Sequence, residues 1–192
     1  MRLIALDGAT RTGYSIWNIT SERVVLEQYG AIQLKHCKKD YLTIQELGQY
    51  LDLIIEQDDF VVIEDIYGRF YKAMKFLIKL QFFLQSYLQQ KGIQFADPIP
   101  VSEWKGSVGK AATKNKEVAP ATGIKGLFEV KEVDKETSIS IVKGLLNSFD
   151  DIDDNMSDSI LIAIYYIRFV LNIEIEIDFS KAKKINYGVG KK

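Results

Sequence analysis

The first 34 residues contain three β-rich runs that are separated by gaps short enough for hairpin turns. Strands are expected at residues 2–7, 13–19 and 23–34, with turns at Gly8–Thr12 and Thr20–Glu22. Strands joined by such short connections pair antiparallel, because a parallel pairing needs a crossover of about a dozen residues or more. The start of the chain therefore predicts the antiparallel half of a sheet.

Helices and short apolar runs alternate through the rest of the chain. Helices are expected at residues 40–56, 69–91, 135–149 and 155–171, and strands at residues 60–63 and 93–96. A strand that follows a helical crossover lies parallel to the strand before it. The sequence thus predicts an α/β fold, a mixed five-stranded sheet in which three antiparallel strands are continued by parallel strands and flanked by helices.

The length of 192 residues indicates one domain, from which two lysine-rich segments stand out. Residues 104–126 contain five lysines, four glycines and a single acid, and a basic loop is expected over residues 104–134. Residues 181–192 contain five lysines and no acid, which predicts a basic flexible tail. The folded domain is expected to span residues 1–180.

Charge and the scarcity of histidine and cysteine exclude several classes of protein. At a net charge of −1, only local basic patches can indicate a nucleic-acid partner. His36 and Cys37 are each the only residue of their kind, so a disulfide and a zinc site are excluded. The N-terminus lacks a signal-peptide pattern, and the apolar stretch 160–171 is shorter than the roughly 18 residues of a membrane span. We expect a cytoplasmic protein without a membrane partner.

Two acids stand at the ends of short apolar strands. Asp7 follows Leu3–Leu6, Glu64 follows Phe60–Ile63, and a glycine comes soon after each acid. Neighbouring parallel strands would bring both carboxylates to the same end of the sheet. Each acid taken alone is also typical of an ordinary turn at the end of a strand. It is therefore the pair of acids that indicates a functional site.

A third group of acids precedes an apolar helix. Asp154 and Asp158 are four residues apart and project from the same helical face, where two like charges repel without a cation between them. Acids at a helix start are also stabilised by the helix dipole. Carboxylates without histidine or cysteine suit Mg²⁺ or Mn²⁺. Pairs of such ions serve phosphodiester cleavage.

Three segments of the chain resemble motifs of the RuvC-like Holliday junction resolvases, particularly phage-type members, in the RNase H-like superfamily. "IALDGATRTGYSIW" is similar to the first strand–turn–strand motif, "VVIEDIYG" to the second motif, and "DDNMSDSILIA" to the last. The motifs occur in family order and span residues 3–163. The resemblance implies an RNase H-like fold and a crossover junction endodeoxyribonuclease, which cleaves branched DNA in recombination and repair. For a phage-encoded member the compartment would be the cytoplasm of the bacterial host.

The resemblance also implies a site for two Mg²⁺ or Mn²⁺ ions. Three metal ligands are matched directly, namely Asp7, Glu64 and Asp158. The fourth ligand is Asp154 on the spacing of the mitochondrial and poxviral members, and Asp151 and Asp153 are the alternatives. Lys105 and Lys135 match lysines that the family places near the DNA backbone, and they complete the expected catalytic set.

The long helix that follows Glu64 carries the expected DNA-binding stripe. Lys72, Lys75 and Lys79 lie at i, i+3 and i+7, as phosphate contacts would require. Tyr67 matches a family aromatic residue near the exchange point of the junction. The expected DNA contacts are Tyr67, Arg69, Lys72, Lys75, Lys79, Arg11, Lys110 and Lys114. The same helix has more apolar residues than one core face needs, and the resemblance implies that some of them form a homodimer interface.

Two other functions fit parts of the sequence. A non-catalytic RNase H-like module would bind branched nucleic acid without cutting it, but no expected carboxylate is replaced by an apolar residue. An actin-like ATPase or sugar kinase also has a phosphate loop after a strand, with Asp-Gly-x-Thr. Those folds need two such domains and a second phosphate loop, which the sequence lacks.

Overall fold

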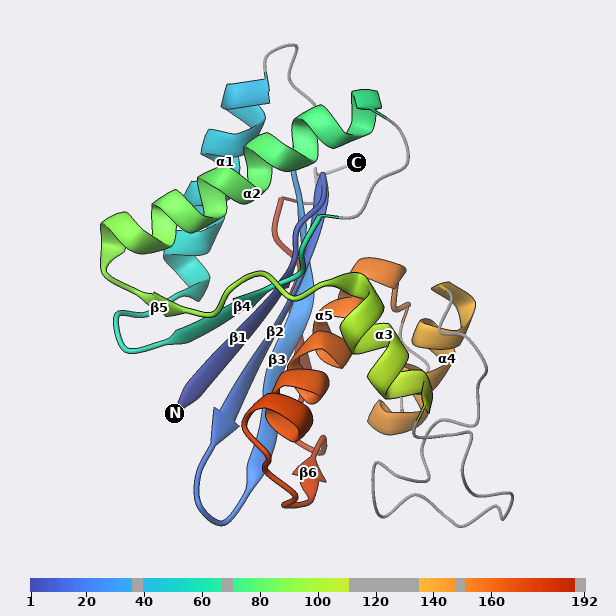
Figure 1. Ribbon diagram of the computed structural model, residues 1–192. Helices are drawn as coiled ribbons and strands as arrows, with labels where there is room; N and C mark the ends of the chain where they lie inside the picture. Colours follow the sequence, from blue (N-terminus) through green and yellow to red (C-terminus); the bar gives the residue numbers. More distant parts are fainter. Residues whose placement is uncertain (36–39, 67–70, 111–134, 148–150, 189–192) are drawn as a thin grey trace.

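The computed structural model describes residues 1–35, 40–66, 71–110, 135–147 and 151–188 (Figure 1). A mixed sheet forms its centre, with helices on both faces.

Three antiparallel strands form the middle of the sheet. β1 (Arg2–Asp7) pairs with β2 (Arg11–Ile19), and β2 pairs with β3 (Val24–Gln33). The short connections leave no room for a crossover, so both pairings are antiparallel. The predicted hairpins are confirmed.

Parallel strands extend the sheet on both sides. β4 (Phe60–Ile63) and β5 (Gln94–Phe95) continue it beyond β1, whereas β6 (Ile177–Asp178) and β7 (Lys183–Lys184) lie beside β3. The order is β5-β4-β1-β2-β3-β6, with β7 also paired to β3. The mixed topology is confirmed, but the residues that the structure describes form a sheet of seven strands rather than the five expected.

The two additional strands come from the segment after the last helix. Part of it, residues 183–187, falls within the predicted flexible tail but follows β3 in the sheet. The backbone N–H of Tyr187 donates to the carbonyl of Ala31 at 3.0 Å. The Tyr187 ring lies 5.9 Å from that of Tyr14 and 6.1 Å from that of Tyr50, between centroids. The tail prediction weighed the lysines alone and was wrong here, because Tyr187 anchors the segment.

Helices cover the two faces of the sheet unequally (Figure 1). α1 (Asp40–Ile54) and α2 (Tyr71–Lys91) lie on one face. On the other face lie α3 (Val101–Lys110), α4 (Lys135–Leu146) and α5 (Asp154–Tyr165). Alternate residues of β1 serve the two cores, because side chains of a strand point to opposite faces. Ile4 packs on the α1/α2 side and Leu3 on the α5 side.

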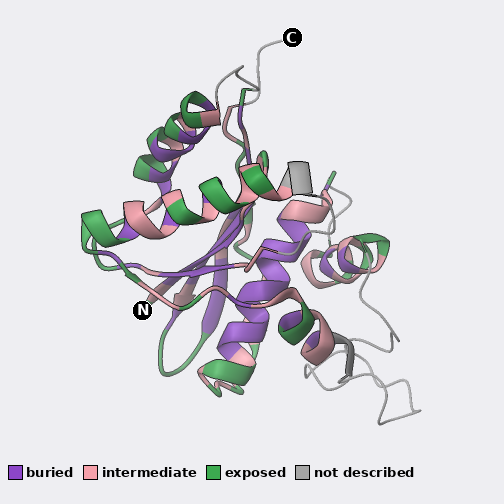
Figure 2. Ribbon diagram, turned by 45° about the horizontal axis from the view of Figure 1, so that its top comes forward, coloured by how far each residue is buried: buried purple, intermediate pink, exposed green. Residues whose placement is uncertain are grey.

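α5 is the central helix of its layer. Every residue from Met156 to Tyr165 is buried, and Figure 2 shows the helix almost wholly in the colour of buried residues. It lies across β1 and β2 and is covered by α3 and α4. A helix that is buried on all sides needs such a position between the sheet and other helices. A π-helical turn, Tyr166–Val170, continues it, so the helix predicted at residues 155–171 changes form near its end.

The first residues of the expected basic loop, 104–110, belong to a helix. Residues 101–110 form α3, which buries Trp104 and Val108 against the α5 side of the sheet. These two residues are four apart and therefore share one helical face. The prediction of a loop from residue 104 was wrong because it overlooked this spacing, and residues 111–134 lie outside the described residues. Of the helices that the structure describes, none is long and apolar enough to cross a membrane.

Candidate active site

Asp7 and Glu64 lie side by side at one end of the sheet. Asp7 is the last residue of β1, and Glu64 follows the last residue of β4. The parallel register pairs Leu6 with Ile63, and the backbone N–H of Glu64 donates to the carbonyl of Leu6 at 3.0 Å. The two strands therefore deliver both carboxylates to the same edge, as their parallel pairing predicts.

Asp158 reaches the same end of the sheet from α5, in one of the helical layers. It lies in the second turn of α5 and lines a pocket of about 330 Å³ together with Asp7 and Glu64. Asp7 is 7% exposed and Asp158 is 8% exposed. β1, the end of β4 and α5 thus present Asp7, Glu64 and Asp158 to one small pocket, which Asp65 also lines.

The pocket raises the pKa values of all three carboxyl groups. Burial is the largest cause for each of them, because a charged carboxylate loses its hydration. The pKa of Asp7 lies well above its usual value, since the neighbouring Glu64 carboxylate adds to the effect of burial. For Asp158, the nearby Lys105 partly offsets the effect of burial. The cluster therefore favours a bound cation.

Two residues of α3 contact these carboxylates directly. The indole Nε1–H of Trp104 donates to Oε1 of Glu64 at 2.8 Å. The Lys105 ammonium lies 3.2 Å from Oδ2 of Asp158 and 4.8 Å from the centroid of the Trp104 ring. Trp104 was not among the predicted site residues, because it was placed at the start of the expected basic loop. Its place directly before the predicted Lys105 was the one available signal.

The donor set suits a hard cation. Among the described residues, no three acidic, histidine or cysteine side chains are already arranged to coordinate one ion together. Oδ1 of Asp158 is nevertheless buried without a hydrogen-bond partner, and such an oxygen is costly to bury. Asp7, Glu64 and Asp158 offer only oxygen ligands, which Mg²⁺ and Mn²⁺ prefer. These residues are therefore the ones that could hold such an ion.

The candidates for a fourth ligand differ in what they contact. Asp154 forms an ion pair with Lys135, and although burial alone would raise its pKa, this pair lowers it. Asp153 caps α5 by accepting from the N–H of Met156 at 2.9 Å. Asp151 is exposed. Asp154 thus remains the proposed fourth ligand, although it does not line the pocket.

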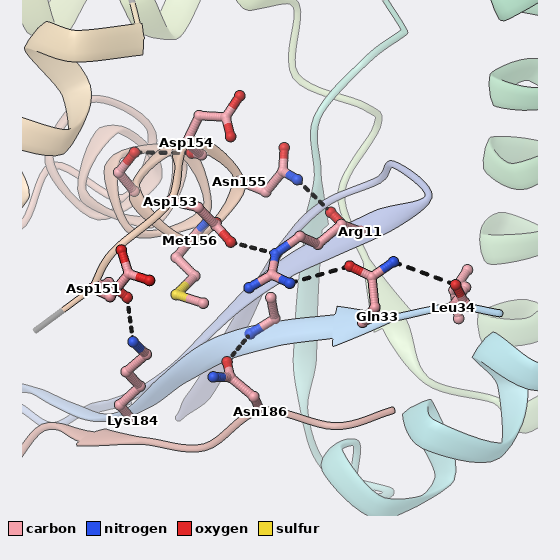
Figure 3. Close-up of polar contacts among 12 residues, drawn as sticks. Arg11, Gln33, Leu34, Asp151, Asp153, Asp154, Asn155, Met156, Lys184 and Asn186 are labelled. Carbon is pink, nitrogen blue, oxygen red and sulfur yellow. Dashed lines mark hydrogen bonds and ion pairs between the residues drawn. The ribbon is translucent and has the colours of Figure 1, made fainter. Parts of the chain in front are cut away.

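The start of α5 is docked onto β2 through Arg11 (Figure 3). The Arg11 guanidinium forms an ion pair with Asp153 and donates to Oε1 of Gln33 at 3.1 Å. Nδ2 of Asn155 donates to the carbonyl of Arg11 at 2.6 Å. These contacts hold the helix that carries Asp158, so the donors of Arg11 already serve the fold.

No family model and no curated protein sequence matches the chain. Several solved structures do match the chain, each with less than 25% identity. Thermus thermophilus RuvC in complex with a Holliday junction substrate matches with a TM-score of 0.55 and 12% identity, over 88% of this chain and 96% of that chain. The yeast mitochondrial Holliday junction resolvase matches with a TM-score of 0.56 and 16% identity, over 87% of this chain and 78% of that chain.

The third match is the fowlpox virus resolvase in complex with its substrate Holliday junction DNA. It has a TM-score of 0.50 and 12% identity, over 86% of this chain and 98% of that chain. The chain has the RuvC-type fold. The predicted RNase H-like α/β architecture is thereby confirmed, and the pocket lies at the end of the sheet where β1 and β4 of this RuvC-type fold finish.

The residues predicted to bind DNA are only partly described. Lys79 pairs with Asp40 of α1 at 2.7 Å and does not line the acidic pocket. Lys75 is exposed on α2. The other predicted contacts lie outside the described residues or have side chains that do: Tyr67, Arg69, Lys72, Lys110 and Lys114. Of the predicted cationic side chains that the structure describes, Lys105 and Lys135 are therefore the two that line the pocket.

Proposed function

We propose that this chain is a divalent-metal-dependent endonuclease that cleaves branched DNA, with Holliday junctions as substrates. The observation that supports this function best is the convergence of Asp7, Glu64 and Asp158 on one pocket of a RuvC-type fold. Two of the similar structures, T. thermophilus RuvC and the fowlpox virus resolvase, contain Holliday junction DNA. The likeness supports the same class of substrate for this chain.

The proposed chemistry assigns a separate task to each group. Asp7, Glu64 and Asp158, with Asp154 as the fourth ligand, would hold two Mg²⁺ or Mn²⁺ ions. Bound there, such ions would supply water of lowered pKa and positive charge beside the phosphate. Lys105 and Lys135 line the pocket and attract the scissile phosphate. The rigid strand ends keep the carboxylates in position, which is the main contribution a protein makes to such a reaction.

Cleavage of a synthetic four-way junction tests this function. We expect nicking of the junction in Mg²⁺ or Mn²⁺, none in EDTA, and recovery when the metal is returned, because the proposed cleavage needs bound ions to lower the pKa of water and to offset the charge of the phosphate. Binding should also weaken steeply with salt, as expected for phosphate contacts. Linear duplex, three-way and flap substrates run in parallel define the preferred branch. Tight junction binding without cleavage under any divalent metal would instead support a non-catalytic module.

The outer face of α2 supports a homodimer as part of this proposal. Phe82 is 71% exposed on this helix, and the neighbouring Ile78 is exposed as well. A hollow of about 800 Å³ lies between α1 and α2, and its lining contains Ile44, Phe83 and Tyr87 as well as charged residues such as Asp40 and Lys79. Exposed apolar side chains on the helix that lines this hollow suit a two-fold contact between two copies of the chain. Two-fold symmetry would match a four-way junction.

We expect Phe82→Ser to convert the protein from a dimer to a monomer in sedimentation experiments, because loss of a large apolar anchor costs about 2 kcal/mol or more at an interface. Phe169→Ser is the matched control, since Phe169 is 49% exposed on the π-helical turn. It should leave the sedimentation coefficient unchanged. A wild-type protein that sediments as a monomer at micromolar concentration would contradict the dimer.

A further inference from the structure

We infer that Trp104 is a positioning residue of the acidic pocket, because its indole N–H fixes one oxygen of Glu64 while its ring face holds the ammonium of Lys105 against Asp158. This inference rests on the proposed function for its consequence. Its geometric part can be tested without any cleavage. Trp104 is assigned no contact with substrate.

The hydrogen bond from Trp104 constrains a side chain that has several rotatable bonds. The indole Nε1 atom of Trp104 lies 2.8 Å from Oε1 of Glu64. This acceptor stands directly after β4 and takes part in a parallel β-bridge. A hydrogen bond to a carboxylate is stronger than one between neutral groups. With Oε1 held by the indole, Oε2 is the oxygen left to serve the pocket.

The indole N–H of Trp104 in turn requires the Glu64 carboxylate as its hydrogen-bond acceptor. Trp104 is fully buried, and its neighbour on the helical face, Val108, is buried in the same core. A buried N–H without an acceptor costs about 1–3 kcal/mol. Since α3 is anchored by its apolar face, the indole cannot turn to solvent, and Glu64 is kept in one orientation.

The ring of Trp104 performs the second task. Nζ of Lys105 lies 4.8 Å from the ring centroid, within the range of a cation–π contact. The same ammonium is 3.2 Å from Oδ2 of Asp158. One tryptophan therefore links the carboxylate after β4 to the carboxylate on α5, which face each other across the pocket.

The second tryptophan of the chain provides a matched control. Trp17 is equally buried, but its Nε1–H donates to the hydroxyl of Ser15 at 2.9 Å rather than to a carboxylate. Replacement of either indole by phenylalanine removes the same atoms from the core. Only the change at residue 104 removes a donor from an acidic group of the pocket.

The direct test is a ¹H–¹⁵N spectrum, in which two tryptophans give two indole signals. The signal missing in Trp104→Phe identifies Trp104. In the Glu64→Gln variant we expect the Trp104 indole proton to move upfield, because a neutral amide is a weaker acceptor than a carboxylate. The Trp17 signal should stay in place. A Trp104 signal that does not move in Glu64→Gln overturns the inference.

The consequence is tested with Mn²⁺ as the probe. We expect Trp104→Phe to weaken Mn²⁺ affinity by about 10-fold, as is usual for residues that orient a metal ligand. Trp17→Phe should change this affinity by less than about twofold. Equal losses in the two variants, or no loss in Trp104→Phe, would contradict the inference. If the indole signal moves but wild-type protein binds no Mn²⁺ and cleaves no junction, the proposed function fails while the contact stands.

Discussion

Replacement of Asp7 by asparagine is expected to abolish junction cleavage and to make the protein more stable. The variant keeps the shape of the side chain but loses a metal-binding carboxylate, which removes several kcal/mol of transition-state stabilisation. Cleavage should slow by about 10³-fold or more, since each 1.4 kcal/mol is about a factor of ten. A gain of about 1 kcal/mol in stability would raise Tm by about 2–4 °C in a protein of this size.

The gain in stability should depend on pH in a defined direction. The pKa of Asp7 is raised by burial first and by the charge of Glu64 second, so the charged form destabilises the folded state. The contribution of protonated Asp7 to stability is fully present below the usual aspartate pKa of about 3.9 and is lost as the pH rises through the raised value. The Tm difference between Asp7→Asn and wild type should therefore be small near pH 4 and grow toward neutral pH.

Melting curves between pH 4 and pH 8 in EDTA measure this difference, and Asp97→Asn serves as a control because Asp97 is exposed. The control should change neither Tm nor cleavage. A wild type that equals or exceeds the stability of Asp7→Asn near neutral pH would show that Asp7 is not strained by its surroundings. Full cleavage by the variant would remove Asp7 from the catalytic set.

Gly13→Ala is expected to have a large effect on the fold itself. A Cβ atom at Gly13 of β2 would lie 1.9 Å from the carbonyl oxygen of Asn155 and 2.3 Å from its carbonyl carbon. Both atoms belong to the backbone of α5, so the helix must move away from the sheet. We expect a loss of about 3 kcal/mol or more, because overpacking against backbone has no easy relief. Tm should fall by about 6–12 °C.

The displacement of α5 should also affect cleavage, because Asp158 moves with the helix. A shift of about 1 Å in a catalytic group can cost about 10²-fold in rate, measured at a temperature where Gly13→Ala is still folded. Gly106→Ala on α3 is the control, since a Cβ atom there meets no atom within 4 Å. Alanine suits a helix better than glycine, so this variant should gain up to about 1 kcal/mol. Equal stability of the two variants would contradict close docking of β2 on α5.

The strands and the place of the first two acids could be predicted because their signals are local. Leu3–Leu6 and Phe60–Ile63 are short apolar runs. The parallel pairing of β1 with β4 follows because the two hairpins make β3 run in the same direction as β1, and a helix connects β3 to β4. The burial of the second half of α5 was likewise readable from the apolar run Ile160–Ile164. Such patterns report the environment of a residue rather than its partner.

The partners of the charged and aromatic side chains could not be predicted, because they depend on elements that meet only in the fold. Trp104 and Glu64 are separated by forty positions. Lys79 looked like a phosphate contact on its helical stripe, yet α1 brings Asp40 next to it. The lysines around Tyr187 indicated a tail exposed to solvent, whereas the ring of Tyr187 packs against other aromatic rings of the fold.

The segment that carries Tyr187 has a further consequence for the behaviour of the protein outside its function. β3 is ten residues long, and β6 and β7 occupy its free edge. The opposite edge of the sheet, β5, is only two residues long. A chain shortened before residue 177 would leave the N–H and C=O groups of β3 open to strands from other molecules, which is a common route to aggregation. Tags and fusions are therefore best placed beyond residue 188 rather than in exchange for this segment.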